Sequence, residues 1–151
     1  MNQRSFINLL QRTCTIRMQS QMRFIQKWLK SKQKKDVTII TQNIDGLHEK
    51  AGSKKVVNFH GSLYHCYCQN CGMTVTAKDY LKSDIHTDCG GVIRPDVVLY
   101  EEAISESAID QSLTAIRKAD LIVIVGTSFR VSPFCNLTDY RNKKARIFCC
   151  E

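Results

Sequence analysis

The chain lacks a long apolar segment. None of its apolar runs approaches the roughly 18 residues of a transmembrane helix, and the N-terminal region lacks the uninterrupted apolar core of a secretory signal. We therefore expect no membrane partner and no export, and we place the protein in the cytoplasm. With 151 residues, 43% hydrophobic and 24% charged, the composition indicates a globular protein of one domain or a part of a larger one.

Acidic residues are absent from the first 35 positions. This segment holds nine Lys and Arg but no Asp, Glu or Gly, so its formal charge is +9. The whole chain carries +8, which leaves −1 for the remaining residues. Because the excess basic charge is confined to this leader, the globular part has no basic character, and we do not expect nucleic acid as a partner.

The basic leader has one segment with helical apolar spacing. Phe24, Ile25, Trp28 and Leu29 fall on one face of a helix over 22–32, which predicts an amphipathic helix before the first strand. Residues 1–20 allow two interpretations, an organellar transit segment or a frayed or non-native leader. We favour the second.

Short apolar runs rich in β-branched residues predict strands at 37–41, 56–59, 121–125 and 146–150. Residues 92–100 have extended character. A helix is predicted to start at Ser105, with its apolar residues on one face: Ala108, Ile109, Leu113 and Ile116. Buried strands alternating with helices indicate an α/β fold with a parallel sheet.

Polar side chains follow the first two predicted strands. Gln42, Asn43 and Asp45 come directly after the first, and His60 ends the second. Ligands of open α/β sheets sit just beyond strand ends, so the amides and the carboxylate are placed to hold ribose hydroxyls. The alternative is a turn over 43–46 that only caps the strand, and local spacing does not decide between the two.

Eight Cys in a chain without an export signal indicate metal or thiol chemistry rather than disulfides. Cys68 and Cys71 have the spacing of a zinc knuckle, and His86 with Cys89 forms a second pair at the expected distance. We predict a structural Cys3His zinc site, with Cys66 as the competing fourth ligand. The surrounding segment has few aliphatic residues, so we expect it to lack a core of its own.

These motifs together resemble the sirtuin family of NAD-dependent protein deacylases. Six of them occur in order across residues 36–148: Thr41 to His48, Phe59-His60-Gly61, Cys68 to Cys71, Cys89-Gly90-Gly91, Arg94 to Val98, and Gly126-Thr127-Ser128 with Pro133. The resemblance implies a Rossmann-like NAD-binding part at 36–62 and 92–151, with an inserted zinc-ribbon module at 63–91. NAD and an acyl-lysine peptide would enter the cleft between these two parts.

The resemblance also implies roles for the residues. Gln42, Asn43 and Asp45 would line the nicotinamide and ribose pocket, and Gly126, Thr127 and Ser128 would hold the more distant part of NAD. His60 matches the catalytic base, which takes a proton from a ribose hydroxyl after the acyl oxygen has displaced nicotinamide. Val97 and Val98 would pair with the peptide backbone as an added strand. The oligomeric state stays open.

The chain departs from the family pattern in three places. The family's Gly-Ala-Gly phosphate loop has no counterpart, since no Gly precedes Gly46. Glu101 stands where Gly is commoner, and Cys149 where Asn is usual. We therefore expect a deacylase impaired as this truncated chain. The alternatives are a catalytically silent zinc-binding remnant and, ranked last, a zinc-ribbon module for nucleic acid.

Overall fold

The computed structural model describes residues 36–150 of the chain. They form two compact units, which meet in the sequence between Tyr100 and Glu101, and each unit is described by itself. The helix predicted over 22–32 and the leader before it lie outside the described residues. Within the described part of the chain, no helix combines the length and apolarity needed to cross a membrane.

The first unit begins with two parallel strands, β1 (Ile39–Thr41) and β2 (Val56–Asn58), separated by the short helix α3 (Leu47–Lys50). Both strands are shorter than predicted, because the ladder runs only from the Ile39–Val56 pair to the Thr41–Asn58 pair. Beyond the ladder, the amide of Phe59 still donates to the Thr41 carbonyl. Leu47, Val57 and Phe59 are buried and anchor this pair of strands.

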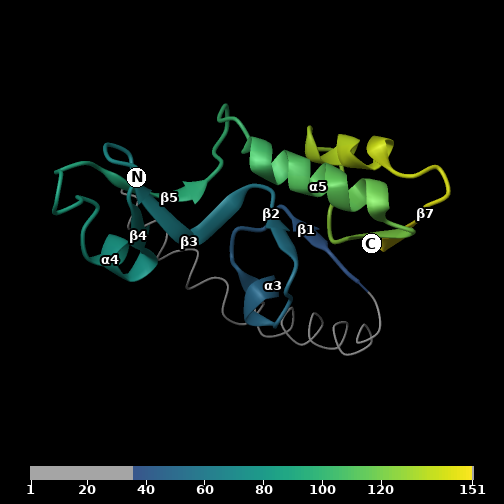
Figure 1. The fold of residues 1–151 in the computed structure, drawn as a ribbon, viewed down its shortest axis with the longest axis horizontal. Coiled ribbons are helices and arrows are strands. Elements are labelled where there is room, and N and C mark those ends of the chain that lie inside the picture. The colour runs from purple at the N-terminus through teal and green to yellow at the C-terminus, as the bar shows by residue number, and fades with distance from the viewer. Residues whose placement is uncertain (1–35, 151) are drawn as a thin grey trace. The chain divides into compact units, whose positions relative to one another are not determined.

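A three-stranded antiparallel sheet follows, in the order β4–β3–β5, which are Thr74–Thr76, Gly61–Cys68 and Ile93–Val97 (Figure 1). The pairing of β3 with β5 is interrupted: Ser62 faces Asp96, but the next pair joins Cys66 to Pro95. The three residues between Ser62 and Cys66 therefore bulge out of the ladder. One of them, Leu63, donates its amide to the carbonyl of Ile44 in the loop after β1.

The sheet has a small core. Cys66, Tyr80 and Ile93 are buried together, and Val75 and Ala77 pack against them. Tyr80 belongs to helix α4 (Ala77–Lys82), which no sequence pattern predicted. The expectation that this segment lacks a core is therefore wrong: two aromatic or aliphatic side chains and one thiol are enough to seat a short helix on the sheet.

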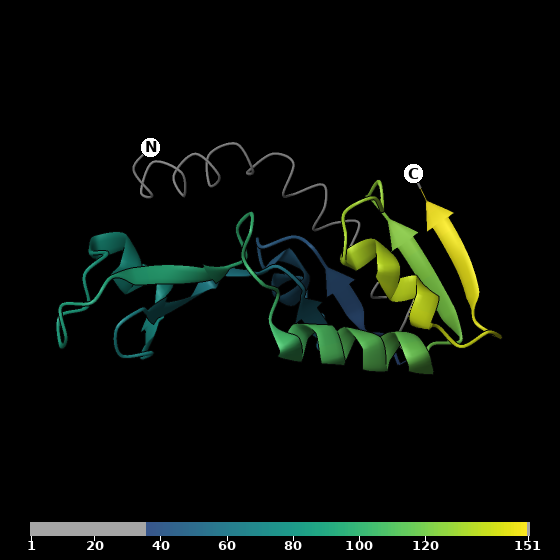
Figure 2. The ribbon, with the colours of Figure 1, turned by 90° about the horizontal axis from the view of Figure 1, so that it is seen from above.

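The second unit contains α5 (Glu106–Lys118), β6 (Leu121–Val125), the 3₁₀ helix η1 (Phe134–Tyr140) and β7 (Arg146–Cys150). β6 and β7 pair in parallel from Leu121–Arg146 to Val125–Cys150 and run side by side (Figure 2). Its buried side chains come from α5, β6 and η1: Ser112, Ile116, Ile122, Phe134 and Leu137. Helix α5 begins after Ser105 as predicted, although the Ser105 side chain makes no capping hydrogen bond.

The predicted α/β fold with parallel strand pairing is confirmed. The strands at 121–125 and 146–150 have the predicted bounds. The four predicted strands form two separate parallel pairs, β1–β2 and β6–β7, rather than one hydrogen-bonded ladder among the described residues.

Candidate active site and metal centre

Four side chains predicted as metal ligands lie together at one end of the antiparallel sheet. The ligand atoms of Cys68, Cys71, His86 and Cys89 are all within 4.8 Å of one another. The Nδ1 atom of His86 is 3.2 Å from the Cys89 sulfur and 3.4 Å from the Cys71 sulfur. Ligands of a tetrahedral zinc ion stand about 3.5 to 3.8 Å apart, so three thiols and one imidazole in this arrangement fit Zn²⁺.

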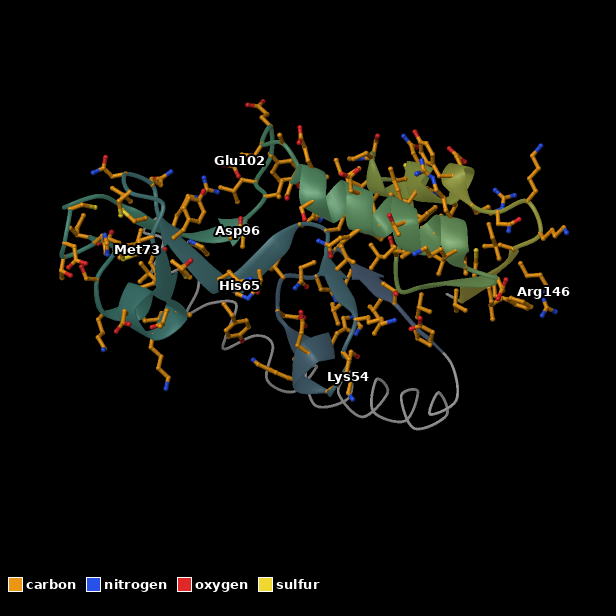
Figure 3. The ribbon with its side chains drawn as sticks, in the orientation of Figure 1. Lys54, His65, Met73, Asp96, Glu102 and Arg146 are labelled. Carbon is orange, nitrogen blue, oxygen red and sulfur yellow. The ribbon has the colours of Figure 1, made fainter. Side chains whose placement is uncertain are left out.

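Two backbone turns hold these side chains in place. In the first, Cys68 ends β3, its amide donates to the carbonyl of Met73, and the Gly72 amide donates to the Cys68 carbonyl (Figure 3 labels Met73). In the second, the amides of His86 and Gly90 bond to the carbonyls of Gly91 and His86. The two turns present their ligands to one point, as paired zinc knuckles do.

The two exposed thiols of the cluster differ in their proton affinity. The pKa of Cys89 is lowered to about 6, first by the hydrogen bond with His86 and then by the amide of Gly91. For Cys71, the Met73 amide lowers the pKa, but burial and the neighbouring Cys89 and Cys68 thiols together raise it above the ordinary value. At neutral pH Cys89 is therefore largely a thiolate, the form in which Cys binds metal.

Cys66, the competing fourth ligand, lies outside the cluster. Its side chain is buried between Tyr80 and Ile93, and this burial raises the pKa of its thiol. His86, and not Cys66, is the fourth side chain of the cluster. The regular alternation of a strand would have placed Cys66 on the same side as Cys68, and both are indeed buried, but only Cys68 is at the turn.

The loop after β1 is held by its own side chains. The Thr41 hydroxyl accepts a hydrogen bond from the Asn43 amide at 3.1 Å, and the Asp45 carboxylate accepts one from the Leu47 amide at 3.0 Å. Gly46 has a left-handed backbone, with φ of 61°, and precedes α3. Asn43 is exposed, whereas Gln42 and Asp45 are half-buried. These hydrogen bonds form the local turn after the strand that the sequence analysis considered, and they fix the loop in one conformation.

His60 lies in the turn between β2 and β3. Its ring makes an edge contact with the buried ring of Phe59, with centroids 5.6 Å apart, and its carbonyl accepts the amide of Val98 at 3.0 Å. Gly61 has a φ of 78°, and a Cβ there would stand 1.9 Å from the Asp96 carbonyl oxygen. The structure therefore brings His60 beside the end of β5, where Val97 pairs with Gly61.

Arg94 is a residue of this region that the sequence analysis did not single out for a role. Its guanidinium Nη2 donates to the carbonyl of Val97 at 3.0 Å, three residues further along the same strand. This bond braces the Val97–Val98 end of β5.

Gly126, Thr127 and Ser128 lie in the second unit, directly after β6. Gly126 has a φ of 65°, and no atom would obstruct a Cβ within 4 Å. The Thr127 hydroxyl accepts the amide of Phe129 at 3.0 Å. This loop follows the carboxyl end of a parallel strand, as predicted, while the Gln42, Asn43 and Asp45 set belongs to the first unit.

Comparison with known proteins identifies a family. A model described as "Sir2 family" matches residues 1–133. A protein from Listeria monocytogenes, named NAD-dependent protein deacetylase, is 92% identical over 114 residues, and one of the same name from Enterococcus faecalis is 58% identical over 122. These matches cover 76% and 81% of this chain but 50% and 52% of the relatives, so the chain spans about half their length.

Solved structures also match the chain. A complex described as "Sir2-p53 peptide-NAD+" superimposes with a TM-score of 0.73 at 28% identity, covering 85% of this chain and 56% of the other. Another, "Structure of Sir2Tm bound to a propionylated peptide", gives 0.67 at 33% identity over 74% of this chain and 50% of the other.

Proposed function

This chain belongs to the Sir2 family, and from that premise we propose that it carries the central part of an NAD-dependent protein lysine deacylase. The observation that supports this most directly is the turn at His60 and Gly61. It fixes a titratable side chain beside the end of β5, through the Val98 to His60 hydrogen bond and the Gly61–Val97 pair. A general base placed next to a peptide-binding strand is what removal of an acyl group from lysine requires.

We assign NAD to the polar loops at the ends of the parallel strands. Gln42, Asn43 and Asp45 are the residues for the nicotinamide and ribose, and Gly126, Thr127 and Ser128 for the more distant part of the cofactor. The conformation of each loop supports this assignment, because hydrogen bonds at Thr41, Asp45 and Thr127 hold the backbone in place before any ligand binds. When bound, NAD supplies the ribose carbon that takes up the acyl oxygen and releases nicotinamide.

His60 acts in this scheme as the general base. Its imidazole accepts a proton from a ribose hydroxyl, which makes that oxygen nucleophilic toward the acyl group. The side chain is half-buried against Phe59, which is only 1% exposed, so the ring has a fixed wall on one side. That wall limits the orientations of the imidazole and keeps its position relative to β5.

The peptide substrate is assigned to β5. This strand is at the edge of its three-stranded sheet, with β3 on one side and no further strand among residues 36–150 on the other. An extended peptide can add to such an edge through main-chain hydrogen bonds. Val97 and Val98 stand at the end nearest His60, so a peptide paired with them would present its acyl-lysine to the base.

The cluster of three Cys and one His is assigned to a structural zinc ion, held by Cys68, Cys71, His86 and Cys89. All four protein ligands are supplied, as in zinc sites without a reactive position. The segment it joins has a core of only a few side chains, so the metal would contribute much of its stability. Reduced Cys ligands are maintained in the cytoplasm, which is the location we propose.

The test is deacetylation of an acetyl-lysine peptide in the presence of NAD, followed by mass spectrometry of the peptide and assay of free nicotinamide. We expect His60→Ala to abolish product formation while retaining peptide binding. His65→Ala is the matched control, because His65 is an exposed imidazole on the neighbouring strand β3, labelled in Figure 3. It should leave the rate unchanged.

The competing interpretation is a zinc-binding member of the family without turnover. It predicts one tightly bound zinc ion per chain and equal, background rates for the unmodified protein, His60→Ala and His65→Ala. A rate that depends on His60 and not on His65 would exclude it.

A further inference from the structure

One ligand of the proposed zinc site is an imidazole, and the structure shows which nitrogen faces the thiols. His86 Nδ1 lies 3.4 Å from the Cys71 sulfur and 3.2 Å from the Cys89 sulfur. The ring is buried, with 9% of the side chain exposed. Nδ1 is therefore the metal-facing atom, and Nε2 must carry the ring proton if the neutral imidazole is to bind a cation.

The group that faces Nε2 is the carboxylate of Asp88. Its Oδ2 atom stands 3.7 Å from Nε2, which is ion-pair distance and somewhat longer than a hydrogen bond, and within residues 36–150 Nε2 has no other polar partner. The second carboxylate oxygen, Oδ1, accepts a hydrogen bond from the Thr87 hydroxyl at 3.2 Å. Thr87 thus holds one oxygen of Asp88, and the other is left to face the ring.

The knuckle backbone makes this arrangement possible. Asp88 lies between two ligands, His86 and Cys89, in a turn closed by the His86–Gly91 and Gly90–His86 backbone bonds. The turn brings the Asp88 side chain back over the residue two positions earlier. A Cys at position 86 would have no ring nitrogen to face Asp88, so this contact exists only because the ligand is His.

We propose that Asp88 is a positioning residue for the metal centre: its carboxylate accepts the Nε2 proton of His86, which selects the tautomer with a free Nδ1 and aims that atom at the zinc ion. Carboxylates that accept from a metal-binding His fix its tautomer and its ring orientation and raise its basicity as a ligand. This inference rests on the zinc site proposed above. It adds a residue that is itself no ligand.

Loss of such an outer partner weakens metal binding by about 10- to 100-fold. Because the Asp88 side chain is 71% exposed and its contact is 3.7 Å long, we expect the lower end of this range for Asp88→Asn, about tenfold. The Asn side chain keeps the shape but lacks the negative charge that holds the Nε2 proton.

The experiment measures zinc affinity by competition with a chromophoric chelator, on the full chain, for the unmodified protein and Asp88→Asn. Asp84→Asn is the matched control, since Asp84 is an exposed carboxylate in the same segment with no recorded side-chain contact among the described residues. The visible spectrum of the Co²⁺-loaded protein gives a second readout, because ligand-field bands report the donor set and the geometry around the metal and not the stability of the fold.

The same pair is then measured in a His86→Cys background. Asp88 acts through the imidazole, so Asp88→Asn should cost about tenfold with His86 and nothing with Cys at that position, a non-additivity that a merely structural role of Asp88 would not produce. Equal affinities for Asp88→Asn and Asp84→Asn in the His86 protein would overturn the inference and leave the zinc site standing. Absence of tight zinc binding by the unmodified protein would overturn the zinc site itself.

Discussion

Gly61 occupies the tightest backbone position beside His60. Its φ of 78° is left-handed, which costs about 1 to 2 kcal/mol for any residue with a Cβ. The Asp96 carbonyl oxygen would be only 1.9 Å from that Cβ, and β5 would have to move away. We predict that Gly61→Ala lowers the free energy of unfolding by more than about 2 kcal/mol, measured by denaturant titration, and displaces the base from the peptide strand.

Gly52 provides the matched control. It also has a left-handed backbone, with φ of 95°, but no atom lies within 4 Å of the Cβ position. Gly52→Ala should therefore show only the backbone penalty, about 1 to 2 kcal/mol, and keep His60 in place. Equal losses for the two variants would mean that β5 yields freely, contrary to the close packing of Gly61 on Asp96.

The two buried cysteines of β3 should respond differently to substitution. Cys68 is in the metal cluster, whereas Cys66 packs on Tyr80 and Ile93. We predict that Cys68→Ala loses zinc, and that Cys66→Ala keeps one ion per chain but is less stable by about 1 kcal/mol, since a buried contact is removed. Metal analysis of the two purified variants checks this, and loss of zinc from Cys66→Ala would make Cys66 a ligand.

At the scale of elements, β3 joins the two chemically distinct ends of the first unit. It starts at Gly61, next to His60, and ends at Cys68 in the metal cluster. Its bulge donates the Leu63 amide to the Ile44 carbonyl, and Tyr64 packs its ring on Gly46. One strand therefore contributes to the position of the base, of the polar loop and of a zinc ligand.

Helix α4 is stabilised at its start by a reciprocal cap. The Thr76 hydroxyl accepts the Asp79 amide and donates to the Asp79 carboxylate at 2.7 Å. The hydrogen bond from Thr76 and the neighbouring Lys82 lower the pKa of Asp79. A carboxyl whose pKa is lower in the folded state stabilises the fold above its unfolded pKa, and this contribution is lost as the pH falls through the folded value.

We predict that Asp79→Asn is less stable than the unmodified protein at pH 7 and that the difference shrinks in acid. The difference should stay constant down to about pH 5, begin to shrink near the ordinary Asp pKa of about 3.9, and disappear only below the lower pKa of the folded state, where the carboxyl is protonated in both states. Thermal unfolding of the two proteins over this range provides the measurement. Both share the same zinc ligands, so acid release of metal affects both alike. A difference that grows in acid would contradict the cap.

The elements that the sequence predicted are those specified by local pattern. β6 is a run of five apolar β-branched or Leu residues, and Cys68 and Cys71 have knuckle spacing. Each of these patterns lies within one short segment, so the sequence predicts the strand and the metal site without knowledge of distant contacts. β3 and α4 were missed for a physical reason. The bulge between Ser62 and Cys66 breaks the alternation of buried residues, and the helix is seated by Ile93, far along the chain. Contacts of that kind leave no local periodicity.

At the scale of the whole molecule, charge is distributed unevenly and glycine even more so. Residues 1–35 carry +9 without an acid, and the remainder is close to neutral. A nucleic-acid-binding protein would gain its affinity from contacts between phosphates and basic side chains, which are concentrated in residues 1–35. We predict that a chain lacking residues 1–35 shows no salt-dependent binding to DNA or RNA in a titration from low to high salt. Retained, salt-sensitive affinity would assign nucleic-acid binding to the globular part.

The last prediction concerns the affinity of these 151 residues for NAD when they are assayed by themselves. Pyrophosphate is normally held by several backbone N–H donors that converge from a Gly-rich turn and a helix N-terminus, and no Gly precedes Gly46. Hydrogen bonds to a charged group contribute about 1.5 to 3 kcal/mol each, so the lack of two weakens binding by about a hundredfold or more. The point charge of a Lys ammonium is a poor substitute for backbone donors fixed by a turn. Calorimetric titration with NAD, using the Listeria monocytogenes relative as the reference, should show this loss, and nicotinamide release should be correspondingly slow. An affinity equal to that of the relative would mean that the loops after β1 and β6 hold the cofactor without the Gly-rich turn.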